Sequence, residues 1–236
     1  MSVDDPGSSQ PSPDQAPRPE TRKITDARTM RALAHPVRIA LLEELVLGGA
    51  LTATELGERI GESPTTCSFH LRQLAKYGFV EEAGGGKGRA RPWRLTSIGI
   101  SFGNTHDDPA TELAASVLSR LVHERQLDRY RSWLESRGTY PREWRNAAND
   151  SEYLYYLTPA ELKEFNQEIT DLLSSKYQDR LVDPAQRPAG SAPVELLMFS
   201  FPIRLPAAED VPGSGSEPGP HGEPGSGGEI PAGGAE

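Results

Sequence analysis

Residues 63–77, SPTTCSFHLRQLAKY, constrain the fold of this chain more than any other stretch. The hydroxyl of Ser63 can cap a helix, and Pro64 suits the first helical position because its missing N–H costs nothing there. The apolar residues recur at helical spacing and therefore share a face: Cys67, Leu71, Leu74 and Ala75. The pattern predicts a short helix with one buried face.

The other faces of this helix carry mainly hydroxyls, amides and cations, which bind phosphates and base edges. The candidate DNA-contacting residues are Thr65, Thr66, Ser68, Phe69, Arg72 and Lys76. Taken alone, this helix is equally consistent with an ordinary solvated surface. The segments before and after it therefore decide between the two interpretations.

Three more helices are predicted ahead of it. Residues 26–34 form a short helix capped by Thr25 or Asp26, and Pro36 starts an apolar helix that runs to Gly48 and Gly49. A third helix begins with a capping box and is closed by Gly61, a typical left-handed cap. The capping box consists of Thr52 and Glu55. Two short helices joined by a tight turn with a glycine are typical of a helix-turn-helix.

A basic β-hairpin is predicted directly after residues 63–77. Residues 79–82 and 93–96 are the two strands, and the glycine-rich segment 84–91 is the loop between them. Four cations lie close together in this hairpin: Lys87, Arg89, Arg91 and Arg94. A hairpin at this place is a wing, and its cations favour contact with phosphate or the minor groove.

These segments together resemble the winged helix-turn-helix domain of ArsR/SmtB-type transcriptional regulators. The resemblance rests on LAHPVR at residues 33–38, TEL at 54–56, residues 63–77 and GFV at 78–80. It implies a homodimeric repressor that dimerises through terminal helices. It also implies that residues 63–77 enter the major groove while the wing follows the DNA backbone.

A metal site is not expected. Metal-sensing members of that family carry paired ligands, but the helix at residues 54–60 contains no cysteine. The other candidate ligands are His106 with Asp107 and Asp108, and His123 with Glu124. Adjacent helical residues point about 100° apart, so His123 and Glu124 do not readily share an ion. We predict no metal and no cofactor.

The charge distribution limits where a polyanion can bind. The chain has a net charge of −9, but residues 22–105 carry +4, whereas residues 1–21 carry −3 and residues 106–236 carry −10. The single cysteine and the absence of a long apolar run indicate a cytoplasmic protein. Phosphate-binding loops and nucleophile motifs are also missing, so we do not expect an enzyme.

The second half of the chain is predicted to be mainly helical. A long helix over residues 109–137 is either packed on its own domain or used for dimerisation, and we favour dimerisation. The apolar residues on or near one side of it are Leu113, Val117, Leu121, Tyr130, Trp133 and Leu134. A second helix starts at the capping box formed by Thr158 and Glu161, and a strand is predicted at residues 194–201.

Aromatic residues concentrate between Tyr130 and Tyr156. They form either a small packed core, which we favour, or a candidate effector pocket. The candidate pocket residues are Trp133, Tyr140, Trp144, Tyr153, Tyr155 and Tyr156.

The sequence therefore predicts a mainly α protein with a small β-hairpin. Its expected parts are a disordered lead (1–21), a winged helix-turn-helix domain (22–105), a helical dimerisation or effector region (106–205) and a disordered Gly/Pro-rich acidic tail (206–236). The predicted function is dimeric repression at a two-fold operator, with a non-metal effector as an option. The alternatives are a winged-helix protein-interaction module and a metal- or thiol-responsive switch.

Overall fold

The computed structural model describes residues 21–84, 91–103 and 105–205. These fall into two units, 21–197 and 198–205. The first unit contains all the helices and strands described below. Residues 1–20 of the predicted disordered lead, and the predicted disordered tail at 206–236, lie outside the described residues.

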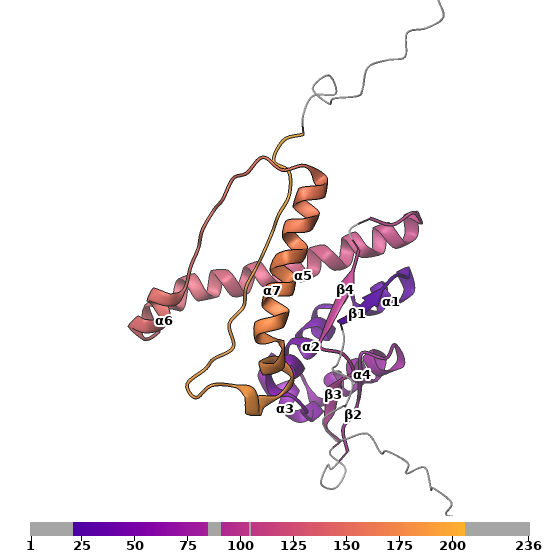
Figure 1. Ribbon diagram of the computed structural model, residues 1–236. Coiled ribbons are helices and arrows are strands. Elements are labelled where there is room, and N and C mark those ends of the chain that lie inside the picture. Colours follow the sequence, from indigo (N-terminus) through magenta and orange to yellow (C-terminus); the bar gives the residue numbers. More distant parts are fainter. Residues whose placement is uncertain (1–20, 85–90, 104, 206–236) are drawn as a thin grey trace, which may run out of the picture. The chain divides into compact units, whose positions relative to one another are not determined.

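The N-terminal part is built from four short helices and two small sheets (Figure 1). Its elements are β1 (Thr21–Ile24), α1 (Ala27–Leu33), α2 (Pro36–Gly48), α3 (Ala53–Ile60), α4 (Pro64–Lys76), β2 (Val80–Glu82), β3 (Trp93–Leu95) and β4 (Gly99–Phe102). The predicted caps are present: Asp26 accepts a hydrogen bond from the Thr29 amide, and Thr52 and Glu55 form a capping box. Each cap satisfies backbone donors that the first helical turn leaves free.

Strands β2 and β3 form the predicted antiparallel hairpin, in which Val80 lies opposite Leu95. Strands β1 and β4 form a second, parallel pair, with Ile24 opposite Phe102. Neither β1 nor β4 was expected from the sequence. Strand β1 thus includes Thr21, the last residue of the segment predicted to be disordered, and Arg22 and Lys23, which precede the expected start near Ile24.

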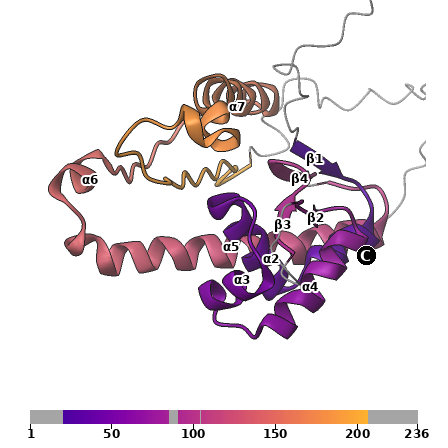
Figure 2. The same ribbon diagram turned by 90° about the horizontal axis from the view of Figure 1, so that it is seen from below.

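The remaining elements are long helices and connecting segments. They are α5 (Pro109–Ser136), η2 (Arg137–Thr139), α6 (Arg142–Ala147), α7 (Pro159–Val182) and η3 (Pro184–Gln186). Both views show α5 running well past the short helices before the chain reaches α6 (Figure 2). The helices predicted to start at Pro109 and at the capping box of Thr158 are confirmed.

The strand predicted at residues 194–201 is wrong, because this segment belongs to no helix or strand. A strand requires a neighbouring strand with which its backbone forms a ladder, and no strand among the described residues pairs with this segment. Apolar composition alone therefore did not decide its conformation.

One hydrophobic core joins the short helices, the hairpin and the first half of α5. Leu41, Leu56, Leu71 and Phe79 are among its most deeply buried side chains. From α5 the core receives Ala114, Ala115 and Leu118, while Leu113 and Val117 are exposed. The side of α5 that carries Leu113 and Val117 is therefore not the side that packs on this domain. Small alanines let α5 approach α1 closely, so they define its buried side instead.

Candidate nucleic-acid interface

Helix α4 presents one continuous exposed side. Four of its six predicted contact residues are exposed at spacings of four, three and four residues: Thr65, Phe69, Arg72 and Lys76. The other two, Thr66 and Ser68, are half-buried, and the Thr66 hydroxyl lies 2.8 Å from that of Ser63 in the N-terminal cap. The exposed side therefore combines a guanidinium, an ammonium, a hydroxyl and an aromatic ring.

The opposite side of α4 anchors the helix in the core. Its buried residues are Cys67, His70, Leu71 and Leu74. The turn from α3 to α4 is tight, because a Cβ atom on Gly57 would lie 2.5 Å from the carbonyl oxygen of Glu62. Gly61 ends α3 with a φ of 75°, in the left-handed region that favours glycine. These two glycines set the direction in which α4 leaves α3.

The β2–β3 hairpin follows α4 as a wing, but its described arginines already have acidic partners. Arg91 contacts Glu82 at 2.6 Å, and Arg94 contacts Glu81 at 2.7 Å. The sequence by itself did not indicate a role for Glu81 or Glu82. The hairpin register places Glu81 directly opposite Arg94, so the pattern of the two strands could have predicted this ion pair. Lys87 and Arg89 lie outside the described residues.

A histidine pair, of which His70 is buried and His35 is half-buried, connects α4 to the start of α2. The rings of His35 and His70 lie 4.4 Å apart, and the His35 Nδ1 atom accepts a hydrogen bond from the Val37 amide. Desolvation, followed by the positive charges of His35 and Arg38, lowers the pKa of His70 below its ordinary value of 6.5. Desolvation and Arg38 also lower the pKa of His35, while Glu62 opposes both shifts. Both imidazoles are therefore favoured in the neutral form.

These shifts predict a pH-dependent stability. An unfolded histidine takes up a proton near its ordinary pKa of 6.5, whereas the folded His70 resists protonation. The contribution of His70 to the free energy of unfolding is therefore fully present above pH 6.5. It is lost as the pH falls from 6.5 through the lower pKa that His70 has in the folded state. Chemical denaturation between pH 7.5 and pH 5 measures this loss.

In the His70→Gln variant we expect a shallower dependence of stability on pH, because the titrating group is gone. The control is His123→Gln, which removes an exposed histidine of α5. Parallel stability curves for wild type and His70→Gln would contradict the prediction.

The surroundings of the lone thiol disfavour its reactive form, and two of the candidate metal ligands take part in local hydrogen bonds. Burial, followed by the charge of Glu62, raises the pKa of Cys67, which disfavours the reactive thiolate. Asp108 caps α5 through the Thr111 amide, and the His106 ring lies 2.9 Å from the Gly103 carbonyl oxygen. Within the described ranges, no three His, Cys, Asp or Glu side chains are grouped as a metal site requires.

The six aromatic residues of the candidate effector pocket do not come together. Trp133 and Tyr140 line an open hollow of about 420 Å³ beside α5, together with Arg125 and Arg129. Trp144, Tyr153, Tyr155 and Tyr156 are not part of its lining. Tyr153 and Tyr155 stack on each other, with ring centroids 6.3 Å apart, and both are exposed.

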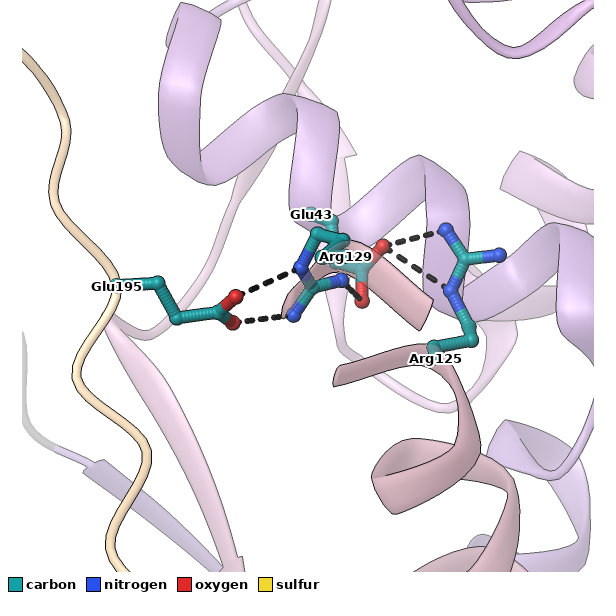
Figure 3. Close-up of polar contacts among 4 residues, drawn as sticks. All are labelled: Glu43, Arg125, Arg129 and Glu195. Carbon is teal, nitrogen blue, oxygen red and sulfur yellow. Dashed lines mark hydrogen bonds and ion pairs between the residues drawn. The ribbon is translucent and has the colours of Figure 1, made fainter. Parts of the chain in front are cut away.

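A chain of ion pairs connects α2, α5 and the segment after η3 (Figure 3). Glu43 of α2 contacts Arg125 at 2.6 Å and Arg129 at 2.5 Å, and Arg129 also holds both carboxylate oxygens of Glu195. Hydrogen bonds to Glu195 and then to Glu43 raise the pKa of Arg129. No sequence signal predicted this network, because its members come from distant segments.

Comparisons with known proteins agree with this description of the N-terminal part. A family model described as a helix-turn-helix domain matches residues 33–83. A probable mercury resistance operon repressor from Streptomyces lividans is 41% identical over 69 residues, which are 29% of this chain and 54% of that protein. The chain thus spans about half the length of the curated relative that it matches.

Among solved structures, reduced HlyU from Vibrio cholerae is 21% identical and covers 40% of this chain and 87% of its own, with a TM-score of 0.26. A MarR family regulator from Neisseria meningitidis is 18% identical and covers 60% of this chain and 79% of its own, with a TM-score of 0.28. With TM-scores this low, neither likeness supports a conclusion about the function of this protein.

The N-terminal part of the chain is a winged helix-turn-helix domain. Its predicted resemblance to ArsR/SmtB-type regulators is confirmed for this part, through the domain match and the repressor relative. Among the described helices, none has both the length and the apolar character that a membrane span requires.

Proposed function

We propose that this protein is a dimeric transcriptional regulator that binds a specific two-fold DNA operator, and that it acts as a repressor. The observation that carries the proposal is the exposed side of α4. The opposite side of α4 is buried in the core, so the helix is held in place beside the wing. Thr65, Phe69, Arg72 and Lys76 offer hydrogen-bond donors and a ring to one groove of the duplex. The repressor relative supports the direction of regulation.

In this proposal the exposed side of α4 and the wing have different roles in DNA binding. The exposed side of α4 reads base edges, and the wing contributes affinity through phosphate contacts. Arg91 and Arg94 take part only after they exchange Glu82 and Glu81 for phosphate oxygens. Both ion pairs are well exposed, and exposed pairs of this kind contribute little stability, so such an exchange costs little.

Dimerisation is proposed to use the outward side of α5. Leu113 is 67% exposed and Val117 is 51% exposed, on a helix whose other side is already buried in the core. A two-fold contact there would place the α4 helices of two copies of the chain in one assembly, as a two-fold operator requires.

A non-metal effector is proposed to bind in the hollow beside Trp133 and Tyr140. The two rings offer apolar contact, and Arg125 and Arg129 would favour an acidic group that displaces their partners Glu43 and Glu195. The residues of the hollow also contact Glu43 of α2, a helix that packs on α4. Release of bound operator by candidate ligands, screened by fluorescence anisotropy, tests this part.

Selection of bound duplexes from a random library tests the main proposal. We expect an enriched palindromic motif, which would establish both specific binding and a two-fold assembly. A library without an enriched motif, together with a stable protein partner in a pull-down, would favour the protein-interaction alternative.

The acidic partners of the wing lead to a further prediction. The double variant Glu81→Gln/Glu82→Gln should bind operator several-fold more tightly at about 0.1 M salt, because two negative charges leave the wing and two arginines become free. The dependence of log K on log salt should steepen by up to about 2. Titrations at several salt concentrations measure both changes.

The matched control is Glu164→Gln/Glu168→Gln, which makes the same change of net charge on exposed positions of α7. If the control tightened binding equally, net charge rather than the wing would be responsible. Unchanged affinity in the wing variant would contradict a wing contact with DNA.

A further inference from the structure

Two arginines of the winged domain lack an acidic partner. In the part of the chain that the structure describes, the side chains of Arg28 in α1 and Arg38 in α2 form no ion pair. The described arginines of the wing differ, because Arg91 and Arg94 are held by Glu82 and Glu81. A guanidinium without an acid is free to bind an oxyanion from outside the chain.

Arg38 is fixed in place by packing rather than by an acid. The residue is half-buried, and its Nε atom is buried with no hydrogen-bond partner among the described residues. Arg38 lies in the first turn after the cap of α2, His35, whose ring is 4.4 Å from that of His70. Burial lowers the pKa of Arg38, and Tyr77 opposes this shift. A half-buried cation favours a counter-charge, and the two neutral imidazoles provide none.

Tyr77 places both arginines beside the C-terminal end of α4. The Arg28 guanidinium lies 6.0 Å from the centroid of the Tyr77 ring, and Arg38 is close enough to interact electrostatically with Tyr77. Tyr77 directly follows Lys76, the last residue of the exposed side of α4. The two arginines therefore adjoin the surface that is proposed to face DNA.

His70 connects the start of α2 to the middle of α4. It is 8% exposed, and its Nδ1 atom is buried without a hydrogen-bond partner among the described residues. Its ring meets the exposed ring of Phe69 edge-on, with the centroids 5.2 Å apart. The histidine pair thus links the turn that carries Arg38 to the exposed side of α4.

We propose that Arg28 and Arg38 bind phosphates of the operator backbone beside Tyr77. These three residues are called the Tyr77 patch. The inference rests on the proposed DNA binding, and it adds a phosphate contact from α1 and α2 to those of the wing. Neither the residue pattern of α4 nor the basic hairpin indicated this contact.

Three features favour a DNA phosphate as the ligand. The guanidinium fork donates two parallel hydrogen bonds, which match the oxygens of a phosphate. The Tyr77 patch adjoins α4, and phosphate contacts from neighbouring elements fix the position of a protein on the duplex. Binding at the patch also breaks no ion pair, whereas Arg91 and Arg94 must first release their acids.

Titrations of the full chain with operator at several salt concentrations test the patch. The Arg28→Gln and Arg38→Gln variants should each bind about tenfold more weakly, because each loses a charge-assisted hydrogen bond to phosphate. The slope of log K against log salt should become shallower by about 1 in each variant. The motif selected from a random library should stay the same, because a phosphate contact carries no sequence information.

Two further variants separate a phosphate contact from other roles. Arg142→Gln removes an exposed arginine of α6 and should keep the wild-type affinity within about twofold. Arg38→Lys keeps the positive charge and should retain the salt slope of the wild type. A merely structural role of Arg38 would lower the affinity in Arg38→Gln without changing that slope. Urea denaturation of each variant checks that it is folded.

A chemical change in the DNA locates the contact without altering the protein. Operators are made with one neutral methylphosphonate at each backbone position in turn. At the position that Arg38 contacts, the methylphosphonate should weaken wild-type binding about as much as Arg38→Gln does, and it should not weaken that variant further. Equal effects on the wild type and on Arg38→Gln at every position would contradict the proposal.

Unchanged affinity and salt slope in both glutamine variants, or an equal loss in Arg142→Gln, would overturn the inference. Inorganic phosphate, titrated without DNA and followed by thermal unfolding, tests a free anion as the ligand. Saturable stabilisation that depends on Arg38, together with unchanged DNA binding in Arg38→Gln, would assign the patch to that anion instead.

The proposed function fails separately, when the library selection with the wild type returns no palindromic motif. The glutamine variants are then compared on a duplex of random sequence, because a phosphate contact does not depend on sequence. An enriched motif combined with unaffected glutamine variants would refute only the Tyr77 patch.

Discussion

Replacing Phe79 by alanine is expected to lower the free energy of unfolding by about 3–5 kcal/mol. The ring is 1% exposed and lies in the core between α4 and β2, with the Arg22 guanidinium 4.5 Å from its centroid. The rigid surroundings would leave a cavity, because its neighbours come from several elements. Urea denaturation followed by circular dichroism measures the loss.

The matched control for this prediction is Phe69→Ala. Phe69 is the same residue type but is 54% exposed on α4, so its loss should cost no more than about 0.5–1 kcal/mol. Equal losses in the two variants would show that Phe79 is not a core residue. A large loss of DNA affinity in Phe69→Ala, without a loss of stability, would agree with the proposed interface.

Replacing Arg72 by alanine is expected to weaken operator binding by about 1–3 kcal/mol, roughly 5- to 150-fold. Arg72 is exposed in the middle of the side of α4 that is proposed to face the groove. If its guanidinium reads a guanine, the selected motif should also relax at one position in each half-site. If it contacts only phosphate, affinity should fall similarly for all sequences.

Arg131→Ala is the control for that experiment, because it removes one arginine from α5. The Arg131 side chain is 65% exposed and pairs with Asp128 of the same helix at 2.6 Å. The affinity of the Arg131→Ala variant for the operator should match that of the wild type within about twofold. An Arg72→Ala variant that bound as tightly as Arg131→Ala would rule out α4 as the reading element.

The exposed residues Thr65, Phe69, Arg72 and Lys76 of α4 were predicted by local rules. Ser63 and Pro64 mark the start of α4, and the 3–4 spacing of its apolar residues separates buried from exposed sides. The same rules found the capping boxes at Thr52 and Thr158. These signals operate within one helical turn, so they need no knowledge of the rest of the fold.

The errors all concern contacts between distant residues. Pairing of β1 with β4 joins residues nearly 80 positions apart, and a four-residue strand carries no local signal for such a partner. The segment 194–201 has strand-like composition but pairs with no strand among the described residues. No prediction named Ala114 and Ala115 as buried, although they permit close packing on α1 while the larger Leu113 and Val117 are exposed.

The sequence alone determined the starts of the capped helices, the hairpin and most of the exposed side of α4, since capping, turn geometry and side-chain periodicity are local. Only the tertiary structure decided which side of α5 is buried and which acids partner the wing arginines. It also decided that Glu195 binds Arg129. Those outcomes depend on which distant groups meet, because burial and ion pairing are properties of contacts rather than of residues.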